Sequence, residues 1–233
     1  MKKVLITGGN KGIGLALTEL FLENGYAVAV IARDFTHFSY KEDKRVQCFA
    51  HDLTDIEAIP QLVREVGEVD VLINNAGIMF SLPHDEYPSD KKEYILKLNL
   101  KAPIALIEAV SRLMVTKGDG RIVNVASIAG EIGHPDIWYG VTKAALINAT
   151  KSFARLLGPD GIVVNCVAPG PVTDTEMFEV VPQARKEQLQ KSTITQTFAT
   201  PVDVAQTVFW LADSSPSYIN GVCIDINNGS FPR

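Results

Sequence analysis

Short apolar runs alternate with longer helical stretches along this chain, and this alternation constrains the fold more than any other feature of the sequence. The runs occupy residues 4–6, 27–31, 46–49, 69–73, 122–125, 162–165 and 223–226. Mostly apolar, β-branched runs separated by helices are typical of a parallel sheet that is covered on both faces. The fold class is therefore predicted to be α/β, a doubly wound parallel sheet of about seven strands with helices on both faces.

Helical patterns fill the stretches between these runs. Gly25 ends a first helix, and residues 100–115 and 139–157 are predicted to form two long, apolar-rich helices. No linker or internal repeat interrupts the sequence, so residues 1–233 are predicted to form a single domain. The least regular stretch is 173–200, and a long segment of this kind often covers a binding site. We therefore expect residues 173–200 to cover the substrate.

The composition excludes several kinds of partner. A net charge of −5 argues against a nucleic acid or an anionic membrane, and no apolar run reaches the roughly 18 residues of a membrane span. Cys48, Cys166 and Cys223 show no C-x-x-C spacing and are predicted to be reduced, buried thiols of a cytoplasmic protein. The four histidines show no metal-ligand spacing, so no metal site is predicted.

The first apolar run leads directly into a glycine-rich segment, Thr-Gly-Gly-Asn-Lys-Gly-Ile-Gly at residues 7–14, and then into a helix. Glycines allow positive φ and a close approach of the backbone, while a helix N-terminus offers free N–H groups and the positive end of a dipole. The segment is therefore predicted to bind the diphosphate of a dinucleotide; the alternative is a glycine-rich turn without a ligand. The residues predicted to contact the cofactor here are Gly8, Asn10, Lys11, Gly12, Ile13 and Gly14.

The second apolar run ends in Ala32-Arg33-Asp34, at the point where a dinucleotide fold meets the adenosine ribose. An acid there binds the 2′-hydroxyl of NAD, whereas an arginine accommodates the 2′-phosphate of NADP. Arg33 and Lys11 are two cations against the single acid Asp34, which is otherwise interpreted as a loop residue that points to solvent. NADP (NADPH) is therefore the preferred cofactor, and NAD stays open as the alternative.

Tyr139 and Lys143 are four residues apart in a predicted helix, so they share one face of it. A lysine ammonium beside a phenol stabilises the phenolate and lowers the pKa of the phenol. A tyrosine tuned in this way can exchange a proton with a carbonyl or alcohol oxygen near neutral pH. The same spacing is also common on ordinary helix surfaces. The pair is therefore significant mainly because the same chain contains the glycine-rich segment.

Seven motifs in the right order make the chain resemble the short-chain dehydrogenase/reductase family over essentially its whole length. Besides the glycine-rich segment they are Asp52-Leu53, Asn74-Asn75-Ala76-Gly77, Asn99, Ser127, the pair Tyr139 and Lys143, and Pro169-Gly170-Pro171-Val172-Thr173. The glycine loop and Arg33 are most similar to NADPH-using carbonyl reductases, whereas the C-terminal part is similar to bacterial 3-oxoacyl carrier-protein reductases. The resemblance implies a Rossmann-type fold.

The resemblance also implies a role for each matching residue. Tyr139 would be the acid in reduction and the base in oxidation, and Lys143 would also bind the nicotinamide ribose. Ser127 would hydrogen-bond the substrate oxygen, and Asn99 would hold a water that links Lys143 to solvent. The further cofactor contacts that it implies are Asp52, Leu53, Asn75, Ala76, Gly77, Tyr139, Lys143, Pro169, Gly170, Val172 and Thr173.

Several of these residues have a purely structural interpretation as well. Ser127 is also a candidate turn cap, Asn99 a polar residue that bonds within its own helix, and Asn75 part of a strand-ending turn. The interval from Ser127 to Tyr139 is one residue shorter than in the family members used for comparison. Trp138, in that interval, is predicted either to shape the pocket or to be a core or subunit-contact aromatic.

These observations predict an NADPH-dependent oxidoreductase that reduces a ketone or aldehyde, including a 3-oxoacyl thioester, with Tyr139 as the general acid. One alternative is an NAD-dependent alcohol dehydrogenase, which Asp34 supports. Another is a non-catalytic dinucleotide sensor, which the presence of Ser127, Tyr139 and Lys143 opposes. The expected partner is a small carbonyl or alcohol substrate, and the resemblance implies a homo-oligomer, a dimer or tetramer built on the helices at 100–115 and 139–157.

Overall fold

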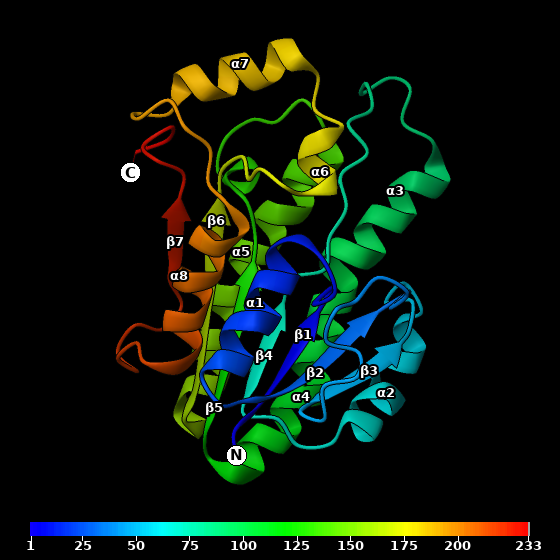
Figure 1. The fold of residues 1–233 in the computed structure, drawn as a ribbon, viewed down its shortest axis with the longest axis vertical. Coiled ribbons are helices and arrows are strands. Elements are labelled where there is room, and N and C mark those ends of the chain that lie inside the picture. The colour runs from blue at the N-terminus through cyan, green and yellow to red at the C-terminus, as the bar shows by residue number, and fades with distance from the viewer. Residues whose placement is uncertain (233) are drawn as a thin grey trace.

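The computed structural model describes residues 1–232 and contains a seven-stranded sheet in which neighbouring strands run parallel (Figure 1). The strands are β1 (Lys3–Thr7), β2 (Ala27–Ala32), β3 (Val46–Ala50), β4 (Val71–Asn74), β5 (Gly120–Val125), β6 (Ile162–Pro169) and β7 (Cys223–Ile226). Their order across the sheet is β3-β2-β1-β4-β5-β6-β7. The predicted α/β class, the number of strands and the Rossmann-type arrangement are confirmed.

Helices connect the strands and cover the sheet. They are α1 (Gly12–Glu23), α2 (Ile59–Val66), α3 (Ser89–Leu96), α4 (Ala102–Lys117), α5 (Ile137–Leu157), α6 (Glu176–Glu179), α7 (Gln183–Ser192) and α8 (Pro201–Asp213). Short 3-10 turns span Ile56–Ala58, Ile128–Gly130 and Gly158–Asp160, and a π-helical segment spans Lys97–Lys101. The helices predicted at 100–115 and 139–157 are confirmed, although the first continues a helical run that begins at Ser89.

The two faces of the sheet carry separate apolar layers, because successive side chains of a strand point to opposite faces. Val4 and Ile6 of β1 pack in the layer that also contains α1 and α8, whereas Leu5 packs in the layer that contains α2 and α4. All three side chains are completely buried. Burying a side chain of this size contributes about 1.5–3 kcal/mol, so β1, β2 and β4 carry consecutive apolar residues instead of alternating with polar ones.

The order in which strands are added to the sheet changes direction at β1. The first three strands extend the sheet from β1 through β2 to β3, and β4 is then added on the other side of β1. Open parallel sheets bind ligands at such a switch point, outside the carboxyl ends of the strands. The residues that follow β1 and β4 are therefore in the position where a ligand is expected.

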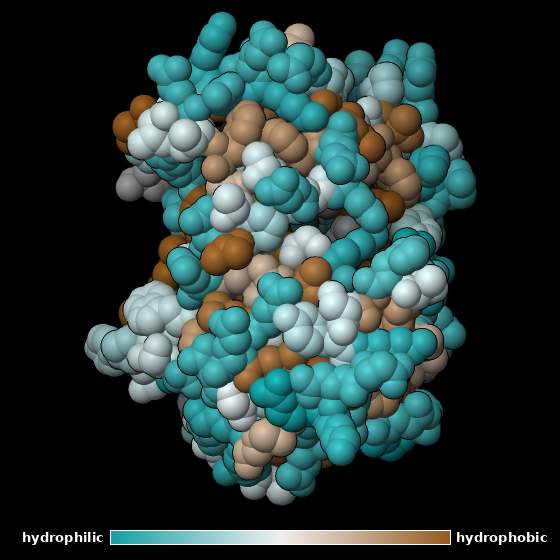
Figure 2. All heavy atoms as spheres, in the orientation of Figure 1, coloured by the Kyte–Doolittle hydropathy of each residue, from teal (hydrophilic) through white to brown (hydrophobic). Residues whose placement is uncertain are grey.

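The segment 173–200 lies at the carboxyl-end side of the sheet, where Figure 1 shows α6 and α7 above the strands. It was predicted as the least regular stretch, but α6 and α7 occupy half of it. None of the residues of α7 is buried. Figure 2 accordingly shows hydrophilic side chains along this end of the molecule, with apolar side chains gathered beneath them.

The thiols and the helices bear on two further predictions. Cys166 is buried, but Cys48 and Cys223 are only half-buried, so the prediction of three buried thiols is correct for one of them. Within residues 1–232, none of the three forms a disulfide bond. Within the described residues, no helix combines the length and the apolar character needed to cross a membrane.

Candidate active site

The turn after β1 packs so tightly against the first turn of α1 that position 14 admits only glycine. A methyl group added at Gly14 would lie 1.9 Å from the carbonyl oxygen of Gly8. Gly8 itself has a φ of +65°, in the left-handed region that favours glycine. Asn75 Nδ2 donates to the carbonyl oxygens of Thr7 and Gly8 at 3.0 and 3.3 Å, which fastens this turn to the end of β4.

The N-terminus of α1 has no side-chain cap, a feature it shares with α2, α4 and α7 but not with α5, α6 and α8. The N-cap residue Lys11 makes no side-chain cap, and the first turn of α1 contains no acid. By contrast, Asp136, Thr175 and Thr200 cap α5, α6 and α8 with their side chains. Uncapped N–H groups at the positive end of a helix dipole favour an anion. The glycine turn and this helix start therefore fit the diphosphate of a dinucleotide.

The adenosine side of this site contains the three charged residues on which the cofactor prediction depends. Arg33 donates from Nη1 to the hydroxyl of Tyr94 at 3.0 Å. Asp34 Oδ1 accepts hydrogen bonds from the backbone N–H and the hydroxyl of Thr36, and these bonds hold the pKa of Asp34 below its usual range. The acid thus forms a local turn, in agreement with its interpretation as a loop residue, while Asn10 Nδ2 donates to its carbonyl oxygen at 2.8 Å.

Lys11, the second predicted phosphate-binding cation, forms an ion pair with Glu176 of α6. Both side chains are largely exposed, so the pair adds little stability. Thr175, one residue earlier, lies beside the glycine turn, since its Cγ2 would be 3.4 Å from a methyl group at Gly12. The segment 173–200 thus contacts the glycine loop directly.

Two predicted cofactor residues follow β3. Asp52 Oδ1 accepts hydrogen bonds from the backbone N–H and the hydroxyl of Thr54, both at 2.9 Å. Leu53 is buried in the apolar layer that contains α2 and α4. The local turn at Asp52 leaves its other carboxylate oxygen available, whereas Leu53 contributes mainly to the core.

The Asn74-Asn75-Ala76-Gly77 motif joins β4 to its neighbours. Asn74 Nδ2 donates to Asn124 Oδ1 at 2.9 Å, and the backbone N–H groups of Asn75 and Ala76 donate to Thr7 Oγ1. These bonds fit the strand-ending interpretation of the motif. Gly77 lies deeper in the site, because a methyl group there would be 3.3 Å from Lys143 Nζ and 3.4 Å from Asn99 Oδ1.

Ser127, Tyr139 and Lys143 are all buried where β5 and α5 meet. Ser127 follows β5, and its Oγ accepts the N–H of Ala129 at 3.1 Å, so its interpretation as a turn cap is correct. Lys143 Nζ donates to the carbonyl oxygen of Val125 at 2.8 Å and lies 5.7 Å from the ring centroid of Tyr139. The fold therefore brings together the hydroxyl, phenol and amine that the sequence separates by up to 16 positions.

The electrostatics of this group differ from the prediction. Burial raises the pKa of Tyr139 above its ordinary value, the Ser127 hydroxyl lowers it, and Asp136 adds to the rise. Burial also lowers the pKa of Lys143 to about 8. The predicted lowering of the phenol pKa by Lys143 is thus wrong for this structure, because burial disfavours both charged forms and the amine is bonded to the Val125 carbonyl.

Asn99 lies in the π-helical segment, and its amide is completely engaged. Its Oδ1 accepts the N–H of Ile78 at 2.9 Å, and its Nδ2 donates to the carbonyl of Ile78 and to Thr142 Oγ1. The interpretation of Asn99 as a residue that bonds within its own helix is therefore wrong. Because Ile78 directly follows Gly77 and Thr142 precedes Lys143, Asn99 joins the end of β4 to α5.

The Pro-Gly motif after β6 carries the chain into the covering segment. Pro169 ends β6, and the N–H of Gly170 donates to Ile226 of β7. Val172 pairs in a β-bridge with Ala199, and the N–H of Thr173 donates to the same residue. The predicted nicotinamide-side residues thus form the base from which the segment 173–200 departs and to which it returns.

An apolar and aromatic cluster borders Tyr139. It contains Ile78, Met79, Phe80, Ile95, Ala129, Trp138, Tyr139 and Met177. Phe80 comes from the segment after β4, Trp138 from the start of α5 and Met177 from α6. Trp138 faces Tyr87, with ring centroids 6.3 Å apart, so within the monomer Trp138 is part of this cluster.

Asp136 is a residue of the site that the sequence did not single out. Its side chain is 1% exposed and caps α5 through the N–H of Tyr139 at 3.0 Å. A sequence signal existed, because aspartate is a preferred N-cap and Asp136 directly precedes the first residue of α5, Ile137. Its long-range contacts could not be anticipated, since they reach residues more than 50 positions away.

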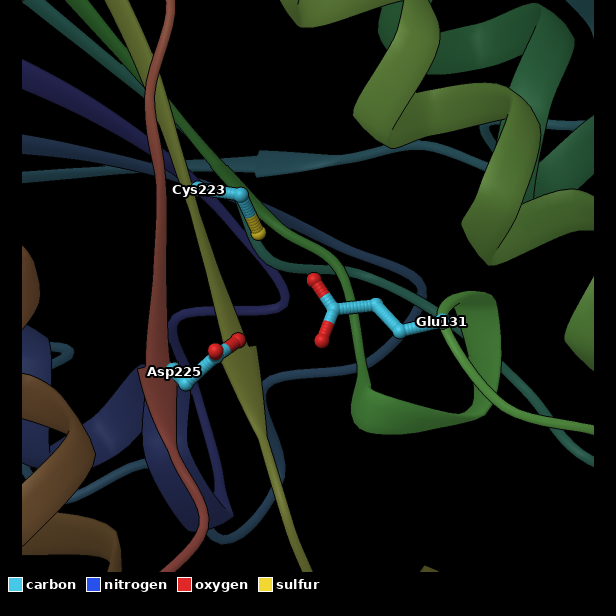
Figure 3. Close-up of side chains that lie close together, drawn as sticks. All are labelled: Glu131, Cys223 and Asp225. Atoms are coloured by element: carbon cyan, nitrogen blue, oxygen red, sulfur yellow. The ribbon is translucent and has the colours of Figure 1, made fainter. Parts of the chain in front are cut away.

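A second set of titratable groups lies away from Tyr139, where the loop after β5 faces the edge strand β7. Glu131, Cys223 and Asp225 point toward one another there (Figure 3), and their potential ligand atoms lie within 4.8 Å of one another. Contact with the Cys166 thiol, burial and the two carboxylates raise the pKa of Cys223. The sequence analysis considered only the spacing of histidines and of cysteines. It therefore did not detect this set, whose members are distant in the sequence and are brought together by the fold.

Comparisons with known proteins agree with this geometry. The family model described as short chain dehydrogenase matches residues 2–186. Galactitol 2-dehydrogenase of Agrobacterium fabrum is 34% identical over 250 residues, which cover 99% of this chain and 97% of that protein. The 3-oxoacyl-acyl-carrier-protein reductase FabG of Staphylococcus aureus is 32% identical over 242 residues, with 99% and 98% covered.

Solved structures also resemble the chain over nearly its whole length. ElxO with NADP bound has a TM-score of 0.91 and 30% identity, and the alignment covers 100% of this chain and 99% of that one. NAD+-bound xylitol dehydrogenase has a TM-score of 0.89 and 30% identity, with 98% of both chains covered. Both similar structures carry a nicotinamide dinucleotide, one of each kind.

Proposed function

The chain belongs to the short-chain dehydrogenase family, whose members act on CH–OH or C=O groups, and we propose that it is an NADPH-dependent reductase of a ketone or aldehyde. The observation that carries this proposal is the grouping of Ser127, Tyr139 and Lys143 in a buried corner between β5 and α5. The uncapped glycine turn before α1 supports the use of a dinucleotide. Together these two sites supply what carbonyl reduction requires, a hydride donor and a proton donor.

The chemistry follows from the positions of the side chains. A bound nicotinamide dinucleotide supplies the hydride that reaches the carbonyl carbon. Ser127 Oγ hydrogen-bonds the carbonyl oxygen, and the Tyr139 phenol donates its proton to that oxygen as negative charge develops there. Burial raises the pKa of Tyr139, so the phenol holds its proton at neutral pH. This is the protonation state that an acid needs at the start of a reduction.

The preference for NADPH is supported by the two cations at the adenosine side. Arg33 directly follows β2, the point where this type of fold meets the adenosine ribose, and Lys11 is the N-cap residue of α1. Asp34 accepts both of its hydrogen bonds from Thr36 on Oδ1, which holds the acid in a local turn like that of Asp52. A charge-assisted bond from Arg33 to a 2′-phosphate would favour NADPH over NADH.

The substrate that we propose is a carbonyl compound with an apolar body. The cluster of Phe80, Trp138 and Met177 beside Tyr139 supports this. We also propose that residues 173–200 cover the substrate, because Met177 of α6 belongs to the same cluster. The name of the FabG relative supports including a 3-oxoacyl thioester among the candidates.

A second candidate is an NAD-dependent alcohol dehydrogenase that runs in the opposite direction. Asp34 favours it, as do the names of the galactitol and xylitol dehydrogenases among the similar proteins. In that direction Tyr139 accepts the proton of the alcohol. The non-catalytic sensor is set aside, because the chain belongs to an enzyme family and retains its proton-transfer residues.

We further propose a homo-oligomer and a cytoplasmic setting. An open groove of about 600 Å³ lies between α4 and α5, and its lining includes Val115, Phe153 and Leu157. Glu108 and Arg112 also line it, and a two-fold axis would bring opposite charges from two copies together. The absence of a disulfide among the three cysteines of the described chain supports a reducing compartment.

The test is cofactor oxidation by the purified protein, NADPH against NADH, with ketones, aldehydes and 3-oxoacyl thioesters of increasing apolar size. We expect turnover with NADPH, and we expect the Tyr139→Phe variant to lose roughly 10²–10⁴-fold in rate while it still binds the cofactor. Oxidation of polyols with NAD+, without reduction of any carbonyl by NADPH, would establish the alternative. Full activity of the Tyr139→Phe variant would remove the proposed mechanism.

A further inference from the structure

Asp136 holds two parts of the active site with one buried carboxylate. Its Oδ1 accepts the backbone N–H of Tyr139 at 3.0 Å. Its Oδ2 accepts the backbone N–H groups of Phe80 and Ser81 at 3.2 and 2.9 Å, and the hydroxyl of Tyr87 at 3.4 Å. The start of the catalytic helix and the segment after β4 thus meet on a single side chain.

The chemistry of these contacts explains why a carboxylate is present. All four partners are donors, and an ionised carboxylate is acceptor-only on both oxygens. A serine or threonine can also cap a helix, as Thr175 and Thr200 do for α6 and α8, but neither has a second side-chain oxygen for the loop. Asp136 therefore accepts more hydrogen bonds than the capping of α5 alone requires.

The segment after β4 depends on these bonds for its shape. Ser81 has a φ of +54°, in the left-handed region that residues with side chains rarely adopt. Such a conformation persists where the surroundings fix it, and the bond from the N–H of Ser81 to Asp136 is one such constraint. Without this hydrogen bond, the segment is less constrained to the conformation that places Phe80 in the cluster with Tyr139.

The same contact organises the aromatic side of the site. The rings of Phe80 and Tyr87, both carried by the segment after β4, lie 6.3 Å apart, and Tyr87 is also 6.3 Å from Trp138. Trp138 directly precedes Tyr139 in α5. Asp136 therefore joins the backbones on both sides of this aromatic group, which borders the proton donor.

We propose that Asp136 is a positioning residue of the active site, which holds Tyr139 and the aromatic segment from Phe80 to Tyr87 as one unit. The proposal rests on the proposed function, since it assigns Tyr139 the role of proton donor. It predicts that the proton donor and the apolar wall are disturbed together when the carboxylate is lost.

An electrostatic consequence gives the proposal a second readout. The negative charge of Asp136 disfavours the Tyr139 phenolate, which keeps the phenol protonated. The other titratable groups near the Tyr139 ring are Lys143, at 5.7 Å, and His134, whose ring centroid is 5.5 Å away. Lys92 of α3 lies farther out, over the ring of Trp138. Removing the charge of Asp136 should therefore lower the pKa at which Tyr139 loses its proton.

The experiment compares Asp136→Ser, which can still cap α5, with Asp136→Asn, which keeps the shape and removes the charge. Asp203→Asn is the matched control, because this acid also belongs to a helix cap but lies in α8. A misplaced proton donor costs up to about 100-fold, so we expect at least a tenfold fall in kcat/KM in both Asp136 variants and none in the control. We also expect faster amide exchange at residues 79–88 and a falling limb of the pH profile that moves to lower pH in Asp136→Asn.

A loss smaller than tenfold in both variants, or unchanged exchange at residues 79–88, would overturn the proposal. A loss of rate with an unmoved pH profile would overturn the electrostatic part. Amide exchange and thermal unfolding do not depend on turnover. If the wild-type protein reduces no carbonyl compound, the proposed function fails, while the exchange measurement still decides whether Asp136 holds the segment.

Discussion

Lys143 Nζ donates a hydrogen bond to the carbonyl oxygen of Val125, 2.8 Å away, so the amine of α5 is anchored to the last residue of β5. Two residues later comes Ser127, and one turn earlier in α5 comes Tyr139. The bond therefore fixes the distance between the strand that carries the hydroxyl and the helix that carries the phenol. It also holds the amine away from the phenol, which explains why Lys143 does not lower the pKa of Tyr139 here.

The buried amine makes the stability of the protein depend on pH. Burial lowers the pKa of Lys143 from its ordinary value of 10.5 to about 8. Between these two values the unfolded chain binds more protons than the folded one, so stability rises with pH in this window, and below pH 8 the burial penalty is complete. Relative to Lys143→Met, the wild type should gain up to about 3 kcal/mol between pH 8 and 10.5. Denaturant unfolding at several pH values measures this gain, and a constant difference would contradict it.

The glycine turn should tolerate no side chain at Gly14. Because an added methyl would lie 1.9 Å from the Gly8 carbonyl oxygen, Gly14→Ala should cost about 3 kcal/mol or more in stability and abolish dinucleotide binding. Gly133→Ala is the matched control, since nothing lies within 4 Å of its added methyl. Thermal unfolding and cofactor titration test both variants. A stable Gly14→Ala protein would mean that the turn is less closed than described.

Arg33 should determine the preference between the two cofactors. Losing a charge-assisted hydrogen bond of about 1.5–3 kcal/mol corresponds to a rise of roughly 10–100-fold in the KM for NADPH in Arg33→Ala. The KM for NADH should stay within about threefold, because NADH lacks the 2′-phosphate. Arg64→Ala is the control, since Arg64 lies on α2 and its guanidinium donates to Gln61 of the same helix. Equal effects on both cofactors would argue against a phosphate contact.

The exposed ion pair between Lys11 and Glu176 should compete with the cofactor phosphate for Lys11. Glu176→Gln should therefore lower the KM for NADPH, while stability changes by less than about 1 kcal/mol because the pair is exposed. The advantage of the variant should shrink as salt rises, since exposed charges are screened. Steady-state kinetics at low and high salt test this. A higher KM in the variant would indicate that Glu176 helps to hold the cofactor.

Most of the fold could be predicted because its determinants are local. The apolar runs, the glycine turn and the stop at Gly25 each act within a few residues, and the sheet, α1 and α5 formed where these signals placed them. The π-helical turn at Asn99 was not foreseen, since one extra residue in a helix leaves no clear trace in apolar periodicity. The helices α6 and α7 were missed because α7 buries none of its residues and so shows no apolar face.

The sequence predicted that Ser127, Tyr139 and Lys143 lie together, but it did not predict their electrostatics. The spacing of Tyr139 and Lys143 indicated a shared helix face, which α5 provides. Burial, however, depends on the whole fold, and it reversed the expected direction of the phenol pKa. The contacts of Asp136 with Phe80 and Ser81 escaped prediction for a related reason, because they join residues that are distant in the chain.

The π-helical turn at Lys97–Lys101 makes the site sensitive to the length of the chain as well as to its residues. A π turn contains one residue more than an α turn accommodates. Deleting one residue before Asn99 would let an ordinary helix close from Ser89 to Lys117, but it would rotate the amide by roughly 100° away from Ile78 and Thr142. In a multiple alignment, a single gap in this stretch would therefore mark a changed active site even in a homologue that keeps the asparagine.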